Sequence, residues 1–397
     1  MHKKPVIALT GATGFLGSHL MSSLLSSGYE IIVLGRSSKE ESLKQRILKL
    51  LRWFGNEEYP GQFEAVEIDF LKPLLGLSAS RYAMLCSRTQ QIIHCASDTC
   101  FSEYKRDQVL DFNVNNLTAL LEFASTARVA FFHYISTAYA AGINGALCGE
   151  KLSTAIDFTN VYEESKARAE KTIHAYCDKF SIPLTLIRPT IVYGDSRTGR
   201  SLKFNALYYP IRSVLNIRDI YLNDILNHGG KRSHHHGIHL DMDGNLILPL
   251  RIYLPKAGGL NLIPVDYFVQ VTQRIIENPV PGGIYHLTSN TPAKLETIAL
   301  YNEQFMKVKG VEIVYGKQKE HISLNPAEEL FDRFIEPYRP YLSDNRIFER
   351  NNTDLATNDL QPPEFNYEIF RRCMAYAIEV NWGERIFSEE KEINELN

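Results

Sequence analysis

A glycine-rich turn near the start of the chain constrains the fold more than any other feature of the sequence. Gly11 and Gly14 lie between an apolar run, residues 6–10, and a stretch of helical period that begins at Phe15, and Gly17 lies in the first turn of that stretch. In a strand–turn–helix unit, glycines at this spacing are typical of dinucleotide binding: they allow a tight turn, a close approach of the pyrophosphate, and packing of the helix on the strand. The helix start then offers N–H groups and a positive dipole end to the phosphates.

The alternative, a glycine-rich turn that binds no ligand, is less compatible with the strand before it and the helix after it. We therefore expect a dinucleotide here. The residues expected at the pyrophosphate are Thr10, Gly11, Thr13, Gly14, Phe15, Leu16 and Gly17.

Short apolar runs alternate with helical stretches over the first two thirds of the chain, and the runs lack polar alternation. This pattern predicts an α/β fold with a doubly wound parallel Rossmann sheet covered on both faces. The expected strands are Val6–Thr10, Glu30–Leu34, Phe63–Ile68, Gln91–Cys95, Phe131–Ser136 and Leu184–Arg188. The expected helices are Phe15–Ser27, Ser42–Phe54, Asp107–Thr126 and Val161–Phe180.

The alternation weakens after Gly194. We expect residues 1–200 to form the cofactor domain, and residues 201–397 to form a smaller, discontinuous α+β substrate cap and a C-terminal region. Part of this second half returns to the Rossmann core around residues 262–290. Asp243-Gly244-Asn245 predicts a hairpin turn in the cap. Residues 320–397 form a charged, aromatic tail.

Charge and composition exclude several functions. The net charge of -3 gives no basic field for nucleic acid. The six cysteines form no Cys-x-x-Cys pair, and the histidines between His228 and His239 fit a solvated loop better than a metal site, so we expect no metal. We find neither a secretory signal nor an apolar run of the roughly 20 residues that span a bilayer, so we expect a cytoplasmic protein without an integral membrane segment.

The end of the second expected strand predicts which dinucleotide is preferred. An NAD site usually has a carboxylate here for the ribose hydroxyls, but this chain has Arg36. A planar guanidinium suits the 2′-phosphate of NADP, and Arg46 could add a second contact. The alternative is that both are surface arginines. We expect NADP(H) to be preferred over NAD(H).

A tyrosine and a lysine four residues apart predict an acid–base pair. Tyr162 and Lys166 fall at the start of an expected helix, where this spacing places both on one face. A nearby ammonium would lower the pKa of the phenol toward a useful range. Thr137 follows the expected strand 131–136, at the sheet edge where ligands bind, and could donate to the same substrate oxygen. Ser136 is the alternative donor.

These motifs, in this order, resemble the extended short-chain dehydrogenases/reductases over roughly residues 5–290. The resemblance rests on the three glycines, Asp69, residues 94–97, Asn113-Val114, Ser136-Thr137, Tyr162-x-x-x-Lys166 and Arg188-Pro189. It implies that Asp69 reaches the adenine, Ala96 borders a ribose, Lys166 holds the nicotinamide ribose and Asn113 supports the proton-relay region. Further residues expected along the cofactor are Phe70, Ser97, Tyr162, Pro189, Thr190 and Val192.

Within that family, three segments resemble the male-sterility-type branch of fatty acyl-CoA reductases and thioester reductases. They are Ser136–Tyr139, Arg188–Gly199 and Asn261–Tyr267. The resemblance implies an NADPH-dependent reductase of a small-molecule or carrier-bound acyl thioester, either acyl-CoA or acyl-carrier protein, or of a related carbonyl compound. The product would be an aldehyde or an alcohol. For the quaternary structure, a monomer and a homodimer both stay open.

Two other functions compete with this reductase. A nucleotide-sugar epimerase or dehydratase would use the same scaffold, but such dehydratases usually carry an acidic pair where Ala138 and Tyr139 follow Thr137. A non-catalytic cofactor sensor would not need the set of Thr137, Tyr162 and Lys166. Apolar residues of the cap could line an acyl groove or could simply pack the cap: Leu202, Phe204, Leu207, Tyr208, Tyr209, Ile211, Val214 and Leu215.

Overall fold

The computed structural model describes residues 4–55, 58–59, 61–143, 147–316 and 323–387. The chain forms two compact units. The first unit comprises residues 1–190, 265–288 and 346–362, and the second comprises residues 191–264, 289–345 and 363–397. The boundary between the two units therefore first falls after residue 190. A late piece, residues 346–362, belongs to the first unit, which also contains the expected cofactor turn.

The first unit is built on a seven-stranded sheet in the order β13-β7-β5-β4-β1-β2-β3, and every pair in it is parallel. Its strands are β1 (Val6–Thr10), β2 (Glu30–Gly35), β3 (Gln62–Glu67), β4 (Gln91–His94), β5 (Phe131–Ile135), β7 (Leu184–Pro189) and β13 (Gly283–Leu287). Every residue of β1, β4 and β7 is buried, because helices cover both faces. The predicted doubly wound parallel sheet is confirmed.

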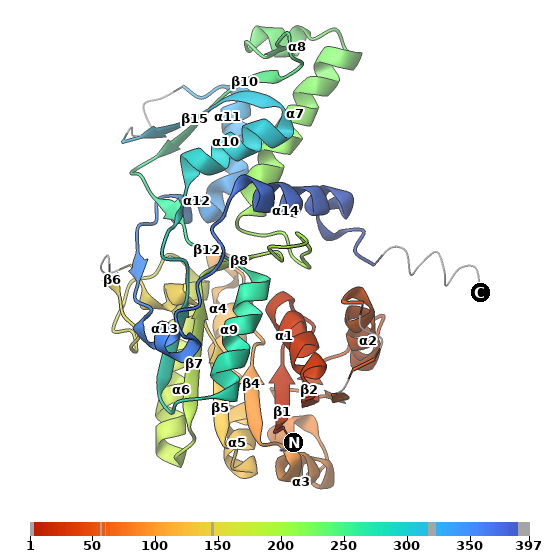
Figure 1. Ribbon diagram of the computed structural model, residues 1–397, viewed down its shortest axis with the longest axis vertical. Coiled ribbons are helices and arrows are strands. Elements are labelled where there is room, and N and C mark those ends of the chain that lie inside the picture. Colours follow the sequence, from red (N-terminus) through yellow and green to blue (C-terminus); the bar gives the residue numbers. More distant parts are fainter. Residues whose placement is uncertain (1–3, 56–57, 60, 144–146, 317–322, 388–397) are drawn as a thin grey trace, which may run out of the picture. The chain divides into compact units, whose positions relative to one another are not determined.

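Helices cover both faces of this sheet. Leu85 of α3 (Ala79–Arg88), Leu120 of α5 (Leu117–Ala127) and Ile173 of α6 (Val161–Phe180) pack on the face that presents Ala8. α1 (Phe15–Ser26) and α9 (Val265–Glu277) lie side by side (Figure 1), joined by a 2.7 Å hydrogen bond from Ser23 to Gln273. α2 (Leu43–Trp53) begins at a capping box of Ser42 and Gln45.

The expected helix over residues 107–126 is interrupted in the structure. It divides into α4 (Arg106–Leu110), a π-turn at Asp111–Asn115, and α5. The N–H of Asn116 bonds to the carbonyl of Asp111 at 2.9 Å, so one extra residue enters the turn. Hydrophobic periodicity does not register one inserted residue, which is why the sequence suggested a single helix.

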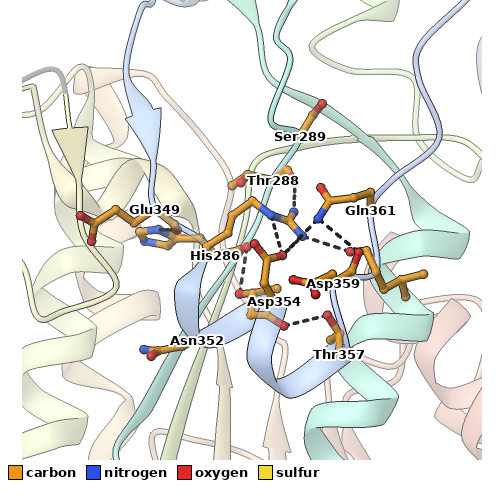
Figure 2. Close-up of polar contacts among 12 residues, drawn as sticks. His286, Thr288, Ser289, Glu349, Asn352, Asp354, Thr357, Asp359 and Gln361 are labelled. Atoms are coloured by element: carbon orange, nitrogen blue, oxygen red, sulfur yellow. Dashed lines mark hydrogen bonds and ion pairs between the residues drawn. The ribbon is translucent and has the colours of Figure 1, made fainter.

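The late piece of the first unit joins it through a short strand and a helix. β16 (Ile347–Phe348) pairs in parallel with β6 (Leu147–Cys148), and α13 (Asn351–Thr357) follows. Arg350 is 4% exposed and donates to the Tyr267 hydroxyl at 3.0 Å, to Asp354 at 2.7 Å and to the Thr288 carbonyl. Figure 2 shows Asp354 and Thr288 at the centre of this polar cluster. A region expected as a charged tail is therefore partly a buried component of the first unit.

The second unit is a small α+β assembly. Its largest sheet pairs β10 (Leu246–Leu254) in parallel with β15 (Val308–Tyr315) and antiparallel with β9 (His239–Leu240). The predicted hairpin is confirmed, with Gly244 of its turn at φ +77°. Its other strands are β8 (Ile191–Tyr193), β11 (Gly259–Leu260), β12 (Leu262–Pro264) and β14 (Ala293–Lys294). Its helices are α7 (Tyr208–Asn227), α8 (Lys231–His235), α10 (Leu295–Met306), α11 (Pro326–Ile335), α12 (Arg339–Leu342) and α14 (Tyr367–Glu379).

Most of the apolar cap residues lie in the interior of this second unit. Phe204, Leu207, Tyr208, Ile211, Val214 and Leu215 are buried, as the packing alternative requires. Tyr209 is exposed and Leu202 is half-buried. Throughout the described ranges, no helix has both the length and the apolar character needed to cross a membrane.

Candidate active site

The glycine-rich turn has the geometry that a pyrophosphate needs. Gly11 has φ +75°, and a Cβ placed there would lie 2.5 Å from the backbone nitrogen of Ala96 at the end of β4. A Cβ at Gly17 would lie 2.2 Å from the Gly11 carbonyl oxygen. No side chain caps α1 at Gly14, so the first N–H groups of the helix are left for an anionic ligand, with Thr13, Phe15 and Leu16 half-buried around them. The turn fits the phosphates of a dinucleotide.

Thr10 supports this turn from inside the protein. It is fully buried, and its Oγ1 accepts from the N–H of Cys95 at 3.2 Å and of Ala96 at 3.3 Å. The same Oγ1 lies 2.7 Å from Nδ1 of His94. Burial, aided by the charge of Lys166, lowers the pKa of His94 to about 3, so the ring is neutral and Nδ1 can accept the Thr10 proton. The Thr10 side chain thus joins the carboxyl ends of β1 and β4, and its hydroxyl is engaged within the protein.

Two arginines meet where β2 ends. Nη1 of Arg46 donates to the Arg36 carbonyl at 2.7 Å, and the exposed Arg36 guanidinium lies 5.4 Å from the centroid of the Phe112 ring. Asp69 accepts from the N–H of Leu71 at 3.0 Å, and this bond is the main reason that the pKa of its carboxyl is lowered, with smaller effects of Lys72 and, last, of Arg36. The structure therefore places Arg46 against the Arg36 backbone and Asp69 within the electrostatic reach of Arg36, while the Phe70 ring packs against the core.

Lys166 is buried at the carboxyl edge of β5. Its ammonium donates to the Ile135 carbonyl at 2.7 Å and lies 4.4 Å from the centroid of the Tyr134 ring. Burial lowers the pKa of Lys166 to about 8, and the nearby Glu170 carboxylate opposes part of this shift. Lys166 is thus still largely protonated at neutral pH.

The pKa of Tyr162 moves opposite to the expected direction. Burial has the largest effect and raises the pKa of this phenol, with smaller contributions from Cys95 and the Glu163 carboxylate. The expected lowering by Lys166 is wrong for this structure, because the ammonium is held at the Ile135 carbonyl while desolvation disfavours the phenolate. Tyr162 consequently carries its proton at neutral pH.

Thr137 is the second residue after β5 and caps the 3₁₀ turn Ala138–Ala141. Its Oγ1 donates to the Pro189 carbonyl at 3.3 Å and accepts from the Tyr139 N–H at 3.4 Å. The neighbouring hydroxyl of Ser136 is buried and has no hydrogen-bond partner among the described residues. Both donors proposed from the sequence therefore lie just after β5. The Thr137 hydroxyl is hydrogen-bonded, whereas the Ser136 hydroxyl has no partner among the described residues.

Asn113 lies in the π-turn and its amide is fully used. Oδ1 accepts from the Asp98 N–H at 2.8 Å and from the Ser97 hydroxyl at 3.1 Å. Nδ2 donates to the Asp98 carbonyl at 2.8 Å and to the Ser165 hydroxyl at 2.8 Å, and Ser165 donates to the Tyr162 carbonyl at 2.7 Å. With both protons and both acceptor positions occupied, this geometry favours positioning of Ser97 and of the Tyr162 helix over direct proton transfer.

Pro189 and Thr190 follow at the end of β7, where the Thr190 N–H donates to the Leu287 carbonyl at 3.1 Å. Val192 belongs to β8 and pairs with Ile263. Of the expected cofactor residues, Val192 alone falls in the second unit, and all the others belong to the first.

The buried ion pair between Arg188 and Glu170, which lies near Lys166, was not predicted from the sequence. Arg188 donates from Nε and Nη2 to the two carboxylate oxygens of Glu170, at 2.8 and 2.6 Å, and both side chains are at most 1% exposed. Nη1 of Arg188 also lies 3.2 Å from Nε2 of His286. Glu170 follows Lys166 by four residues on α6. An acidic residue on the same face of the helix as Lys166 is the feature of the sequence that could have predicted a buried ion pair here.

The histidine-rich segment forms no metal site. His234 and His235 lie on the short helix α8 and are exposed. Across the part of the chain with a described structure, no group of three or more His, Cys, Asp or Glu side chains could hold a metal ion.

The sequence matches the family model described as male sterility protein over residues 9–272. A nonribosomal peptide synthetase of Aspergillus flavus is 25% identical over 379 residues, which is 89% of this chain and 33% of that protein. The large subunit of L-2-aminoadipate reductase of Penicillium chrysogenum is 27% identical over 235 residues, 54% of this chain and 16% of that protein. The chain spans a third or less of the length of these relatives.

Solved structures share the fold at lower identity. The terminal R domain from the myxalamid PKS-NRPS biosynthetic pathway has a TM-score of 0.73 and 21% identity, over 95% of this chain and 91% of that chain. UDP-glucuronic acid 4-epimerase from Bacillus cereus, in complex with NAD, has a TM-score of 0.63 and 16% identity, over 95% and 98%. Both a terminal R domain and an epimerase thus share this architecture.

Proposed function

We propose that this chain, which belongs to the male sterility protein family, is an NAD(P)-dependent oxidoreductase of the extended short-chain dehydrogenase/reductase type. In this proposal it reduces acyl thioesters with NADPH. The observation that carries the proposal is the composition of the β5 edge. Thr137, Tyr162 and Lys166 supply proton donors and a cation there, while Ala138 and Tyr139 after Thr137 are buried and offer no carboxylate. Reduction of a carbonyl needs donors to the developing oxyanion, whereas dehydration also needs a base for a C–H proton.

The residues of the chain divide this work between them. NADPH, when bound, supplies the hydride. Tyr162 keeps its proton at neutral pH because burial raises the pKa of the phenol, so its hydroxyl can donate to the carbonyl oxygen as negative charge develops. The Lys166 ammonium, four residues along the same helix, compensates the charge left on the phenol. Thr137 is the second donor to the same oxygen, after its hydroxyl turns from the Pro189 carbonyl.

In the same proposal, one unit binds the cofactor and the other contributes to binding of the substrate. The first unit holds the cofactor through the turn 10–17, Arg36, Asp69 and Lys166. The second unit contributes the substrate-binding cap. The acyl group would arrive on CoA or on a carrier protein, and the relatives that are peptide synthetases favour a carrier. The product is an aldehyde or an alcohol, and the location is the cytoplasm.

The proposal is tested by the choice of substrate. NADPH oxidation is followed with acyl-CoAs of increasing chain length and with the same acyl groups on a carrier protein, and the Tyr162→Phe variant serves as the blank. Each buried methylene adds about 0.8 kcal/mol, so we expect kcat/KM to rise about fourfold per methylene until the acyl site is full. Inertness toward every thioester, together with conversion of a UDP- or dTDP-sugar, would show an epimerase or dehydratase instead.

Cofactor preference depends on Arg36 in this proposal. We expect Arg36→Ala to weaken NADPH binding by about one to two decades and to leave NADH binding nearly unchanged, because a charge-assisted hydrogen bond to the 2′-phosphate contributes about 1.5–3 kcal/mol. Fluorescence titration of both cofactors measures it. Arg52→Ala is the matched control, since it removes an exposed arginine from the same helix that carries Arg46. Equal affinity of the parent protein for NADPH and NADH contradicts the assignment.

A further inference from the structure

Arg346 reaches the active site from the late piece of the first unit. Its side chain is 7% exposed. Nη1 donates to the Gly142 carbonyl at 3.2 Å, Nη2 lies 3.5 Å from Oε1 of Glu163, and the guanidinium carbon lies 4.6 Å from the centroid of the Tyr139 ring. One buried cation therefore contacts a backbone carbonyl, a carboxylate and an aromatic face.

Two of these contacts belong to the turn that carries Thr137. The Tyr139 N–H donates to Thr137 Oγ1, and the Gly142 N–H donates to the Tyr139 carbonyl at 3.1 Å. Gly142 has φ +76°, and a Cβ there would lie 2.3 Å from the Ala155 Cβ, so this end of the turn has little room to shift. Arg346 thus fixes both ends of the segment that follows Thr137.

The third contact belongs to the helix that carries Tyr162. Glu163 is the next residue along α6, its side chain is fully buried, and Oε2 accepts from the Thr159 N–H at 3.1 Å. The other oxygen of this carboxylate faces Arg346. Arg346 is thereby placed between the two elements that supply the proposed proton donors.

We propose that Arg346 is a positioning residue that holds the Thr137 turn and the start of the Tyr162 helix at a fixed separation, so that both donors reach one substrate oxygen. This inference rests on the proposed function. Donors contribute fully only when they are held at the place where charge develops, and a misplacement of about 1 Å from a residue outside the chemistry can cost about 10²-fold in rate.

The late piece does not need Arg346 to stay attached to the first unit. Glu150 accepts from the N–H of His286 at 2.8 Å and from the hydroxyl of Thr353 at 2.7 Å, and Arg350 forms the cluster of Figure 2. The Phe348 ring also packs edge-on against Tyr139, with centroids 5.6 Å apart. A change at Arg346 should therefore disturb the donors more than the fold.

The test compares Arg346→Met, which removes the charge, with Arg346→Lys, which keeps it. With NADPH and octanoyl-CoA, we expect Arg346→Met to lower kcat about 10- to 100-fold, with the NADPH Kd within about twofold of the parent, and Arg346→Lys to recover part of the loss. Arg274→Met is the matched control, because Arg274 donates to the Thr357 carbonyl of the same piece at 2.6 Å from α9. Its kcat should stay within about threefold of the parent.

Hydrogen exchange supplies a second readout that needs no substrate. In Arg346→Met the amides of Tyr139, Gly142 and Thr159 should exchange faster by about tenfold or more, and in Arg274→Met they should not. If the parent protein reduces no thioester, the proposed function is refuted. The exchange rates of these three amides then still test whether Arg346 holds the Thr137 turn and the Tyr162 helix in place. Unchanged exchange at the three amides in Arg346→Met overturns the positioning role of Arg346. If the parent protein is active, a kcat of Arg346→Met equal to that of the parent overturns it as well. If Arg346→Met does not fold, Tyr139→Leu takes its place, and the same loss of kcat is expected. Unchanged amide exchange or an unchanged kcat in Tyr139→Leu would overturn the positioning role.

Discussion

Tyr162→Phe is expected to lower kcat by at least about 10²-fold, because it removes the proposed general acid and one donor to the oxyanion. Its NADPH affinity should stay within about twofold of the parent, since the ring and its packing against Phe101, with centroids 5.9 Å apart, are retained. Steady-state oxidation of NADPH with a saturating acyl-CoA measures kcat, and fluorescence titration of the cofactor measures the NADPH affinity.

Lys166→Ala is the companion variant. It removes a cation that is proposed both to support Tyr162 and to hold the nicotinamide ribose, so turnover and cofactor affinity should fall together. If Tyr162→Phe keeps more than about a tenth of the parent activity, the general acid lies elsewhere. The Ser136 hydroxyl, which has no hydrogen-bond partner in the described part of the chain, would then be the next donor to replace.

Arg188→Met is expected to lower the free energy of unfolding by about 3–5 kcal/mol, because it leaves the Glu170 carboxylate buried without its charge partner. The two side chains are joined by two hydrogen bonds of 2.6 and 2.8 Å and are almost fully removed from solvent. Chemical denaturation followed by circular dichroism measures the loss.

The matched control is Arg168→Met on the same helix. Arg168 lies 2.5 Å from Glu164, but its side chain is 55% exposed, so its loss should cost about 0–1 kcal/mol. The double variant Arg188→Met/Glu170→Leu should recover much of the stability, because it removes both buried charges. Equal losses for Arg188→Met and Arg168→Met would contradict the assignment of a desolvated pair.

The sequence could predict the sheet and most of its helices because these depend on local periodicity. The helix Val161–Phe180 and the strand Val6–Thr10 have the bounds expected from the sequence. A continuous apolar run identifies a strand buried on both faces, and a cap residue such as Asn160, which accepts from the Glu163 N–H, identifies where a helix begins. The cofactor turn was predictable for the same reason, since its three glycines are close in the chain.

The remaining features depend on contacts that no local pattern encodes. Arg346 meets Glu163 across more than 180 positions of the chain, and nothing around residue 346 distinguishes it from a surface arginine. The pKa of Tyr162 also depended on burial, which the spacing of Tyr162 and Lys166 does not report. The amide of Asn113 could be assigned a positioning role only after its four hydrogen bonds, to Ser97, Asp98 and Ser165, were known.

The assembly of the first unit from three separate pieces sets an order on its folding during synthesis. When residue 190 has left the ribosome, the outer edge of β7 is still unpaired, because its neighbour β13 is not made until residues 283–287. Arg188 then lacks His286, and the Tyr162 helix lacks Arg346. A nascent chain can therefore form the cofactor turn early, but it completes the surroundings of its proton donors only after residue 362 has emerged.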